Sequence, residues 1–125
     1  MSKPPKTIGI VEDDASMRRA TEALLDAHGF TTLAFSSAED FLARGMASQF
    51  DCLLLDIHLG GMSGIELHYR LKALGRACPV IFVTALESDA VWRQAVETGC
   101  VACLRKPVPG GQLVEAIAKA GSLKN

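Results

Sequence analysis

The chain has 125 residues, 49% of them hydrophobic and 22% charged, and its formal net charge is −1. This is the composition of one ordinary globular domain. No apolar run approaches the ~18 residues of a membrane span, and Lys and Arg are scattered rather than clustered as in nucleic-acid-binding proteins. Residues 1–7 lack the apolar segment of a secretory signal, so we expect a cytoplasmic protein with no membrane contact and no direct binding to nucleic acid.

Short apolar runs alternate with helical patterns along the chain. The sequence predicts strands at residues 7–11, 31–35, 52–56, 80–84 and 100–105. It predicts helices at residues 15–28, 38–43, 65–74, 89–97 and 112–120. Continuous apolar strands, each followed by a helix, indicate a parallel sheet covered on both faces. The expected fold is an α/β, flavodoxin-like (βα)5 doubly wound sandwich with strand order 2-1-3-4-5, forming one domain over residues 1–125 with its core at about 6–120.

The helical patterns also give expectations for single positions. The first predicted helix has one apolar stripe, formed by Met17, Ala20, Leu24 and Ala27. Gly29 is expected to end that helix, and Ser37 with Asp40 has the spacing of a capping box for the next. His28 and His68 share no metal-ligand spacing and are expected on helix surfaces.

The four cysteines are Cys52, Cys78, Cys100 and Cys103. The last two have CxxC spacing, but they fall in the predicted strand 100–105, where residues three apart point to opposite faces. We therefore expect buried, reduced thiols rather than a metal site or disulfides.

Charged and polar residues follow the predicted strands at their carboxyl ends. Glu12, Asp13 and Asp14 follow the first strand, Asp56 ends the third, Thr84 ends the fourth and Lys106 follows the fifth. In open parallel sheets this edge is where ligands bind. Converging carboxylates repel one another unless a cation lies among them, and hard oxygen ligands suit Mg²⁺.

Each residue also has a simpler interpretation. Asp14 taken singly is best explained as the N-cap of the first helix, and Glu12 and Asp13 could complement that helix's dipole. Thr84 could be a β-branched strand residue and Lys106 a solvated lysine. Asp56 is harder to explain in this way, because a carboxylate closing a buried apolar strand is costly without a purpose. The joint presence of these residues at strand ends favours a functional site.

These residues carry a family resemblance that covers roughly residues 6–120. The segments concerned are Val11-Glu12-Asp13-Asp14, the strand end at Asp56, Val83-Thr84-Ala85 and Lys106-Pro107. They resemble the signature of the response-regulator receivers of two-component systems, the CheY-like superfamily, and residues 37–42 resemble its FixJ-type branch. Such receivers commonly precede a helix-turn-helix output domain, so the chain is expected to be a stand-alone or an excised receiver.

The resemblance implies a role for each site residue. Asp56 would accept a phosphoryl group from a histidine kinase or phosphotransfer protein. Mg²⁺ (or Mn²⁺) would be held by Asp13, Asp56 and the backbone carbonyl of His58, and by Glu12 mainly through water. Thr84 would hydrogen-bond the phosphoryl oxygen and Lys106 would pair with it, with a cis bond between Lys106 and Pro107. The chain would assist its own phosphorylation and dephosphorylation without turning over a separate substrate. A carboxylate nucleophile among cationic groups is chemically consistent with these roles.

The sequence departs from the family pattern at a few positions. Leu59-Gly60 stands where Met-Pro is common shortly after the phosphorylated Asp, and Gly60 and Gly61 are expected to loosen that loop. Cys103 stands at the position of the aromatic switch, and Val108 stands where Phe is common. We expect output through the fourth helix, fifth strand and fifth helix, a face that could also support a homodimer, without an aromatic rotamer switch. His58 and Leu86 would border the path of the hydrolytic water, and the apolar Leu86 is expected to slow dephosphorylation.

Other functions fit the sequence less well. A haloacid-dehalogenase-type phosphatase needs a second Asp where His58 stands, and the run from Gly60 to Gly64 matches no nucleotide-binding motif. The alternative that stays open is a receiver-like interaction module that is not phosphorylated, because the switch position is altered.

Overall fold

The computed structural model describes residues 6–85 and 88–124. Five parallel strands form one sheet in the order β2-β1-β3-β4-β5, as the sequence predicts. The strands are β1 (Thr7–Val11), β2 (Thr31–Phe35), β3 (Cys52–Asp56), β4 (Val80–Thr84) and β5 (Ala102–Arg105). The helices are α1 (Ala15–Ala27), α2 (Ala38–Arg44), α3 (Gly64–Ala73), α4 (Asp89–Glu97) and α5 (Gly110–Lys124).

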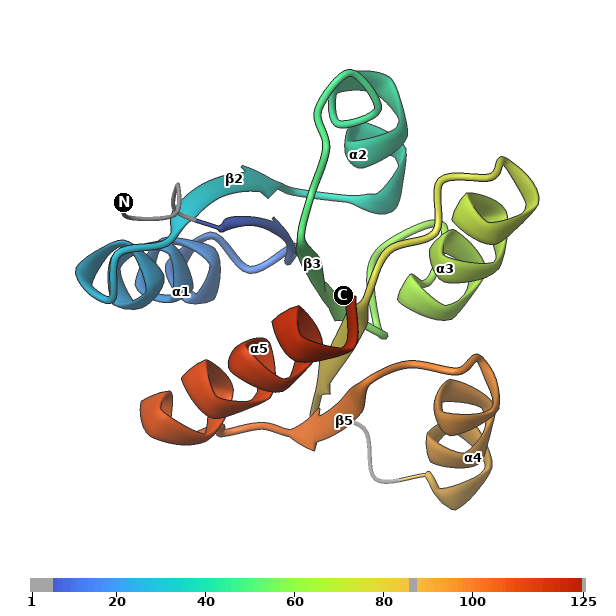
Figure 1. Ribbon diagram of the computed structural model, residues 1–125. Coiled ribbons are helices and arrows are strands. Elements are labelled where there is room, and N and C mark those ends of the chain that lie inside the picture. The colour runs from blue at the N-terminus through green and yellow to red at the C-terminus, as the bar shows by residue number, and fades with distance from the viewer. Residues whose placement is uncertain (1–5, 86–87, 125) are drawn as a thin grey trace.

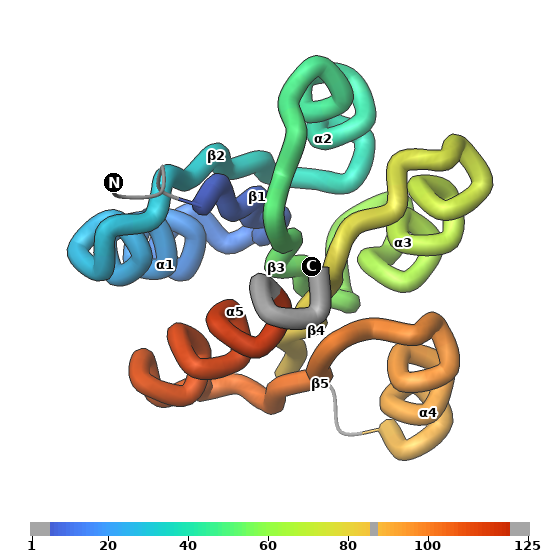
Figure 2. Tube along the Cα trace, viewed as in Figure 1, coloured from blue at the N-terminus to red at the C-terminus, as the bar shows by residue number. Residues whose placement is uncertain are grey.

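Helices cover both faces of the sheet. Helices α1 and α5 lie on one face, and α2, α3 and α4 lie on the other (Figures 1 and 2). Each face has its own apolar cluster, one centred on residues such as Ile8, Leu54 and Ile117 and the other on Leu53, Leu55 and Phe82. The central strand β3 contributes to both clusters, because alternate side chains of a strand point to opposite faces.

Side-chain caps explain where most helices begin. Asp14, Ser37, Ser63 and Ser88 are N-caps whose side chains accept a hydrogen bond from a backbone N–H in the first turn. The reciprocal capping box occurs at Ser63 and Glu66, not at Ser37. At α2 the carboxylate of Asp40 accepts from the N–H of Ser36 instead, at 3.3 Å, so the predicted capping box there is wrong in its second half.

Three residues of the predicted stripe of α1 lie on one side of the helix, but that side does not coincide with the closed core. The fully buried residue of this helix is Leu25, whereas Met17 is 38% exposed and Ala20 and Ala27 are exposed. The reason is that Met17, Ala20 and Leu24 line a cavity of about 180 Å³ between α1 and α5, rather than a closed interface. The helix ends close to the predicted place, with Gly29 at a φ of 87°.

Two further expectations need correction. Strand β5 begins at Ala102, so Cys100 lies in the preceding turn, and Cys100 and Cys103 pack against the same apolar cluster. The predicted opposite-face geometry is therefore wrong. Both cysteines are free thiols, as predicted, but they are half-buried rather than buried. His68 is not at the surface: it is 3% exposed, because it lies on the face of α3 that packs against Phe82, with a distance of 5.7 Å between the ring centroids.

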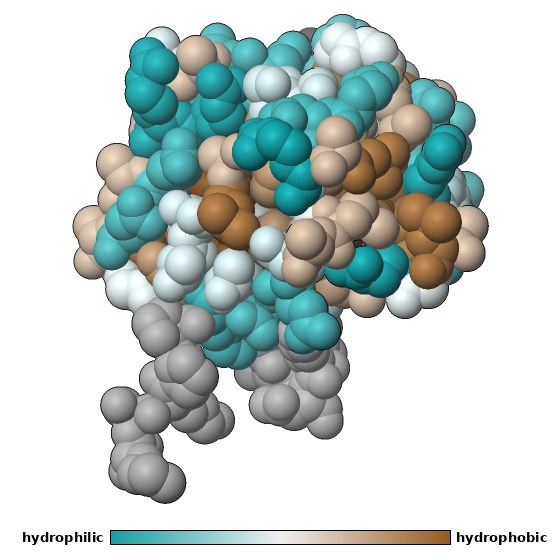
Figure 3. Space-filling model, turned by 90° about the horizontal axis from the view of Figure 1, so that it is seen from above, coloured by the Kyte–Doolittle hydropathy of each residue, from teal (hydrophilic) through white to brown (hydrophobic). Residues whose placement is uncertain are grey.

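The outer surface mixes polar and apolar side chains. On the face seen from above, hydrophobic residues lie among hydrophilic ones (Figure 3). Within the described ranges, the structure contains no helix with the length and apolar character needed to cross a bilayer.

Candidate functional site

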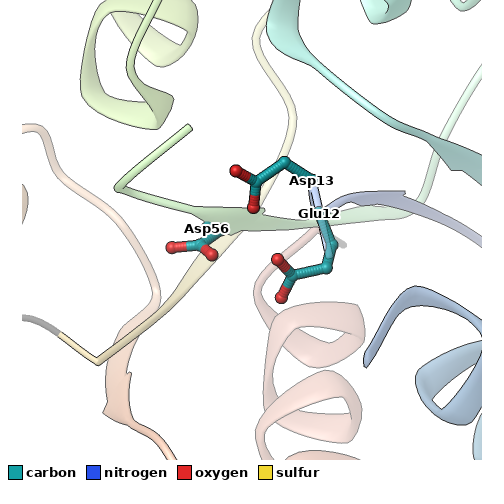
Figure 4. Close-up of side chains that lie close together, drawn as sticks. All are labelled: Glu12, Asp13 and Asp56. Carbon is teal, nitrogen blue, oxygen red and sulfur yellow. The ribbon is translucent and has the colours of Figure 1, made fainter. Parts of the chain in front are cut away.

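Three carboxylates converge at the carboxyl ends of β1 and β3. One oxygen atom from each of Glu12, Asp13 and Asp56 lies within 4.8 Å of the others (Figure 4). Glu12 and Asp56 are each 7% exposed, whereas Asp13 is exposed to solvent. Their convergence follows from the sheet, because β1 and β3 are hydrogen-bonded neighbours in which Val11 pairs with Leu55. The sequence prediction that these three residues meet is confirmed in its geometry.

Lys106 joins two of these carboxylates. Its ammonium Nζ lies 2.6 Å from Glu12 Oε1 and 2.9 Å from Asp56 Oδ2. The residue follows the last residue of β5, and the Lys106–Pro107 peptide bond is cis, as the family resemblance implies. The ammonium therefore partly neutralises a cluster that would otherwise contain only negative charge.

Burial and ion pairing oppose each other in setting the pKa values here. Burial raises the pKa of Glu12, and the hydrogen bond from Lys106 only partly offsets it. Burial would lower the pKa of Lys106, but hydrogen bonds to Glu12 and Asp56 outweigh it, so the pKa of Lys106 is raised. Lys106 is therefore held in its charged form.

The β3–α3 loop, residues 57–63, begins at the site. The N–H of His58 donates to Asp56 Oδ1 at 3.0 Å, so both carboxylate oxygens of Asp56 have a protein partner. The first residue of α3, Gly64, lies so close to the site that a Cβ atom there would be 2.2 Å from the carbonyl oxygen of Asp56. Glycine is therefore required where the loop passes behind Asp56.

Thr84 ends β4 and is 1% exposed. It lies one strand further from β1 than Asp56, and Asp56 pairs in register with its neighbour Val83. Thr84 is thus at the same sheet edge as the carboxylates, as predicted. Leu86, expected to border the path of the hydrolytic water, lies outside the described residues.

The structure adds residues that the sequence did not single out. Arg18 of α1 donates from Nη1 to the carbonyl oxygen of Glu12 at 2.9 Å. Glu39 of α2 accepts a hydrogen bond from the N–H of Met62 at 2.9 Å, across 23 positions of sequence. No sequence spacing predicts either contact, because each depends on how separate segments of the chain pack together. Asp14 is the N-cap of α1, in agreement with its simpler interpretation.

Comparison with known proteins decides the family. Residues 8–118 match the model of the response regulator receiver domain. The chain belongs to this family. The receiver domain is 35% identical over 111 residues to Nodulation protein W of Bradyrhizobium diazoefficiens, covering 89% of this chain and 49% of that protein. It is 33% identical over 113 residues to Transcriptional regulatory protein FixJ of the same organism, covering 90% of this chain and 55% of that protein.

Solved structures agree with this assignment. A CheY-like receiver domain protein from Methanospirillum hungatei superposes with a TM-score of 0.89 at 28% identity, covering 96% of each chain. The chain spans about half the length of the curated relatives it matches. Similarity to FixJ agrees with the branch expected from residues 37–42.

Proposed function

We propose that this receiver domain accepts a phosphoryl group on Asp56 and does so with Mg²⁺ or Mn²⁺ held beside it. The observation that carries the proposal is the convergence of Glu12, Asp13 and Asp56 within 4.8 Å, with Lys106 bound to two of them. Ionised, the three carboxylates exceed the charge of Lys106 by two, which a divalent cation would balance.

The donor set fits such an ion. Asp13 and Asp56 would bind it directly, Glu12 would act mainly through water, and the backbone carbonyl of His58 would complete the protein ligands. All of these donors are hard oxygen atoms, which Mg²⁺ prefers. The ion would supply positive charge to the phosphoryl oxygens.

In the proposed transfer, a carboxylate oxygen of Asp56 attacks phosphorus as the bond from phosphorus to the donor's imidazole nitrogen breaks. The bonding electrons leave with that nitrogen, and the product is an aspartyl phosphate. Lys106 is already 2.9 Å from Asp56 Oδ2 and would pair with the phosphoryl group. The Thr84 hydroxyl would donate a hydrogen bond to it. No turnover of a separate substrate is required.

The phosphoryl donor belongs to a stated class, a histidine kinase or a histidine phosphotransfer protein, as membership of the family implies. Output would pass through α4, β5 and α5, a face that could also support a homodimer. On this face Arg105 of β5 stacks over the ring of Trp92 of α4, with its Cζ 5.0 Å from the ring centroid, and Val96 is 54% exposed. Cys103 packs against the core here, so this output would work without an aromatic residue at that position.

The test is incubation with acetyl phosphate and Mg²⁺, followed by intact-mass measurement. We expect wild-type protein to gain the mass of one phosphoryl group and the Asp56→Asn variant to gain none. Equal modification of the variant would place the acceptor elsewhere. No modification of the wild type, either by acetyl phosphate or by a phosphorylated phosphotransfer protein, would favour the alternative of an interaction module that is not phosphorylated.

A further inference from the structure

The β3–α3 loop contains two adjacent glycines, Gly60 and Gly61, which give it unusual backbone freedom. Bonds at its two ends limit that freedom. At the start, the N–H of His58 is bound by Asp56, and at the end the capping box of Ser63 fixes the first turn of α3. The glycine segment between these ends needs support from elsewhere in the fold.

Glu39 of α2 provides this support. Its Oε2 accepts a hydrogen bond from the N–H of Met62 at 2.9 Å. Gly61 has a φ of +83°, and a Cβ atom at Gly61 would lie 2.7 Å from the same oxygen, so the carboxylate lies directly against the loop backbone. The hydrogen bond from Met62 is the largest factor lowering the pKa of Glu39, so the acceptor is an ionised carboxylate, the stronger kind of acceptor.

We propose that Glu39 is a positioning residue for the phosphorylation site: by holding the loop at Met62, it fixes the backbone that presents His58 to the metal. This inference rests on the function proposed above. Without Glu39 the glycine segment samples more conformations, and metal binding must then order it. An ordering cost appears as lost metal affinity, because site geometry depends on the groups that support the ligands.

The coupling works in both directions. If the contact between Glu39 and Met62 favours metal binding, then metal binding favours the contact by the same factor. Phosphorylation, which uses the same site, would therefore be sensed in α2 through Glu39. A purely structural role in α2 would have no such link to the metal.

The experiment compares Glu39→Ala, Glu39→Gln and Asp40→Ala with wild-type protein. Glu39 is exposed, so its variants are expected to fold. Asp40 is the matched control, because it lies on the same helix but bonds to Arg44, at 2.6 and 2.7 Å, and to the N–H of Ser36, and not to the β3–α3 loop. Mn²⁺ affinity is measured by calorimetry. The amide signal of Met62 is followed by ¹⁵N-resolved NMR, with and without Mg²⁺.

We expect Glu39→Ala to weaken Mn²⁺ binding roughly tenfold, the lower end of the usual effect of losing an outer-shell partner. Glu39→Gln keeps an acceptor oxygen and should restore most of the affinity, and Asp40→Ala should match wild type. The Met62 amide signal should shift on Mg²⁺ addition in wild-type protein. It should move upfield in Glu39→Ala, because the hydrogen bond to the carboxylate is lost.

Three results would overturn the inference. If wild-type protein binds Mn²⁺ and Glu39→Ala binds it with the same affinity, Glu39 has no positioning role, and the proposed function is unaffected. Equal weakening in Glu39→Ala and Asp40→Ala would assign the effect to α2 in general. Absence of Mn²⁺ binding by wild-type protein would overturn the proposed function, and this inference with it.

Discussion

Thr84 and Arg105 are register partners at the ends of β4 and β5, and Arg105 in turn stacks on Trp92 of α4. The residue proposed to bind the phosphoryl group is thus two contacts away from an aromatic ring on the proposed output face. This chain of contacts would give the proposed output a route to that face that does not use Cys103.

The chain has a single tryptophan, so this route can be observed directly. We predict that beryllofluoride with Mg²⁺ changes the fluorescence of Trp92, because a shift of Thr84 moves the neighbouring strand and its Arg105. The variant Arg105→Ala should keep beryllofluoride binding and lose most of the fluorescence change. A full change in that variant, or none in wild type, would mean that the site and α4 are not connected in this way.

Repulsion within the acidic cluster gives a second prediction. In the absence of metal, Asp13→Asn should stabilise the fold by about 1 kcal/mol, because it removes one of three neighbouring negative charges. Mg²⁺ at a hundred times its dissociation constant should stabilise wild-type protein by about 2.7 kcal/mol and the variant far less. Thermal unfolding with and without Mg²⁺ measures both. Equal stabilisation of the two proteins by Mg²⁺ would show that the ion binds elsewhere.

Two glycines near Asp56 should respond in opposite ways to the same substitution. Gly64→Ala should destabilise the domain by about 3 kcal/mol, because its Cβ would lie 2.2 Å from the carbonyl oxygen of Asp56. Gly60→Ala has no heavy atom within 4 Å of the new Cβ and should be neutral or stabilising by up to about 1 kcal/mol. Urea unfolding of the two variants makes the comparison. Similar effects at both positions would contradict the close approach at Gly64.

His68 gives a prediction on pH. Burial, with a smaller effect of Lys72, lowers the pKa of His68 from 6.5 to about 4, and its Nδ1 has no hydrogen-bond partner among the described residues. The unfolded chain therefore binds this proton more readily than the folded one. The resulting stability is complete above pH 6.5 and is lost as the pH falls toward 4, by roughly 3 kcal/mol in total.

The His68→Leu variant tests this prediction. It fills the buried position with an apolar side chain that does not titrate, and it leaves every other titrating group in place. Urea unfolding between pH 7 and pH 4 should show a shallower loss of stability in the variant than in wild-type protein. If the free energy of unfolding falls equally with pH in both proteins, protonation of His68 does not destabilise the fold, and the prediction is wrong.

The sequence was sufficient to predict the sheet order and the acidic site, since both follow from apolar runs and from the residues that end them. A strand such as Cys52–Asp56 can be recognised locally, and parallel pairing then brings Asp56 next to Glu12. The sequence was insufficient where packing between elements decides. The burial of His68 and the exposure of the α1 stripe depend on which side of each helix packs against the sheet. Short amphipathic patterns predict that orientation only coarsely.

Contacts between separate elements were also beyond the sequence. Glu39 and Met62 are 23 positions apart, and neither residue type indicates the other. The capping box at Ser63 is different. Its Ser-x-x-Glu spacing is present in the sequence, but the glycines before it favour a turn and hide the start of α3.

The ion pairs of Lys106 also constrain when the site can form during synthesis. Lys106 is 94 positions from Glu12 and 50 from Asp56. A nascent chain that has left the ribosome only as far as β4 has all three carboxylates but not the ammonium group that neutralises them. The ion-paired site therefore becomes complete only after β5 has been made, and under the function proposed above an unfinished chain would present Asp56 without its ammonium partner.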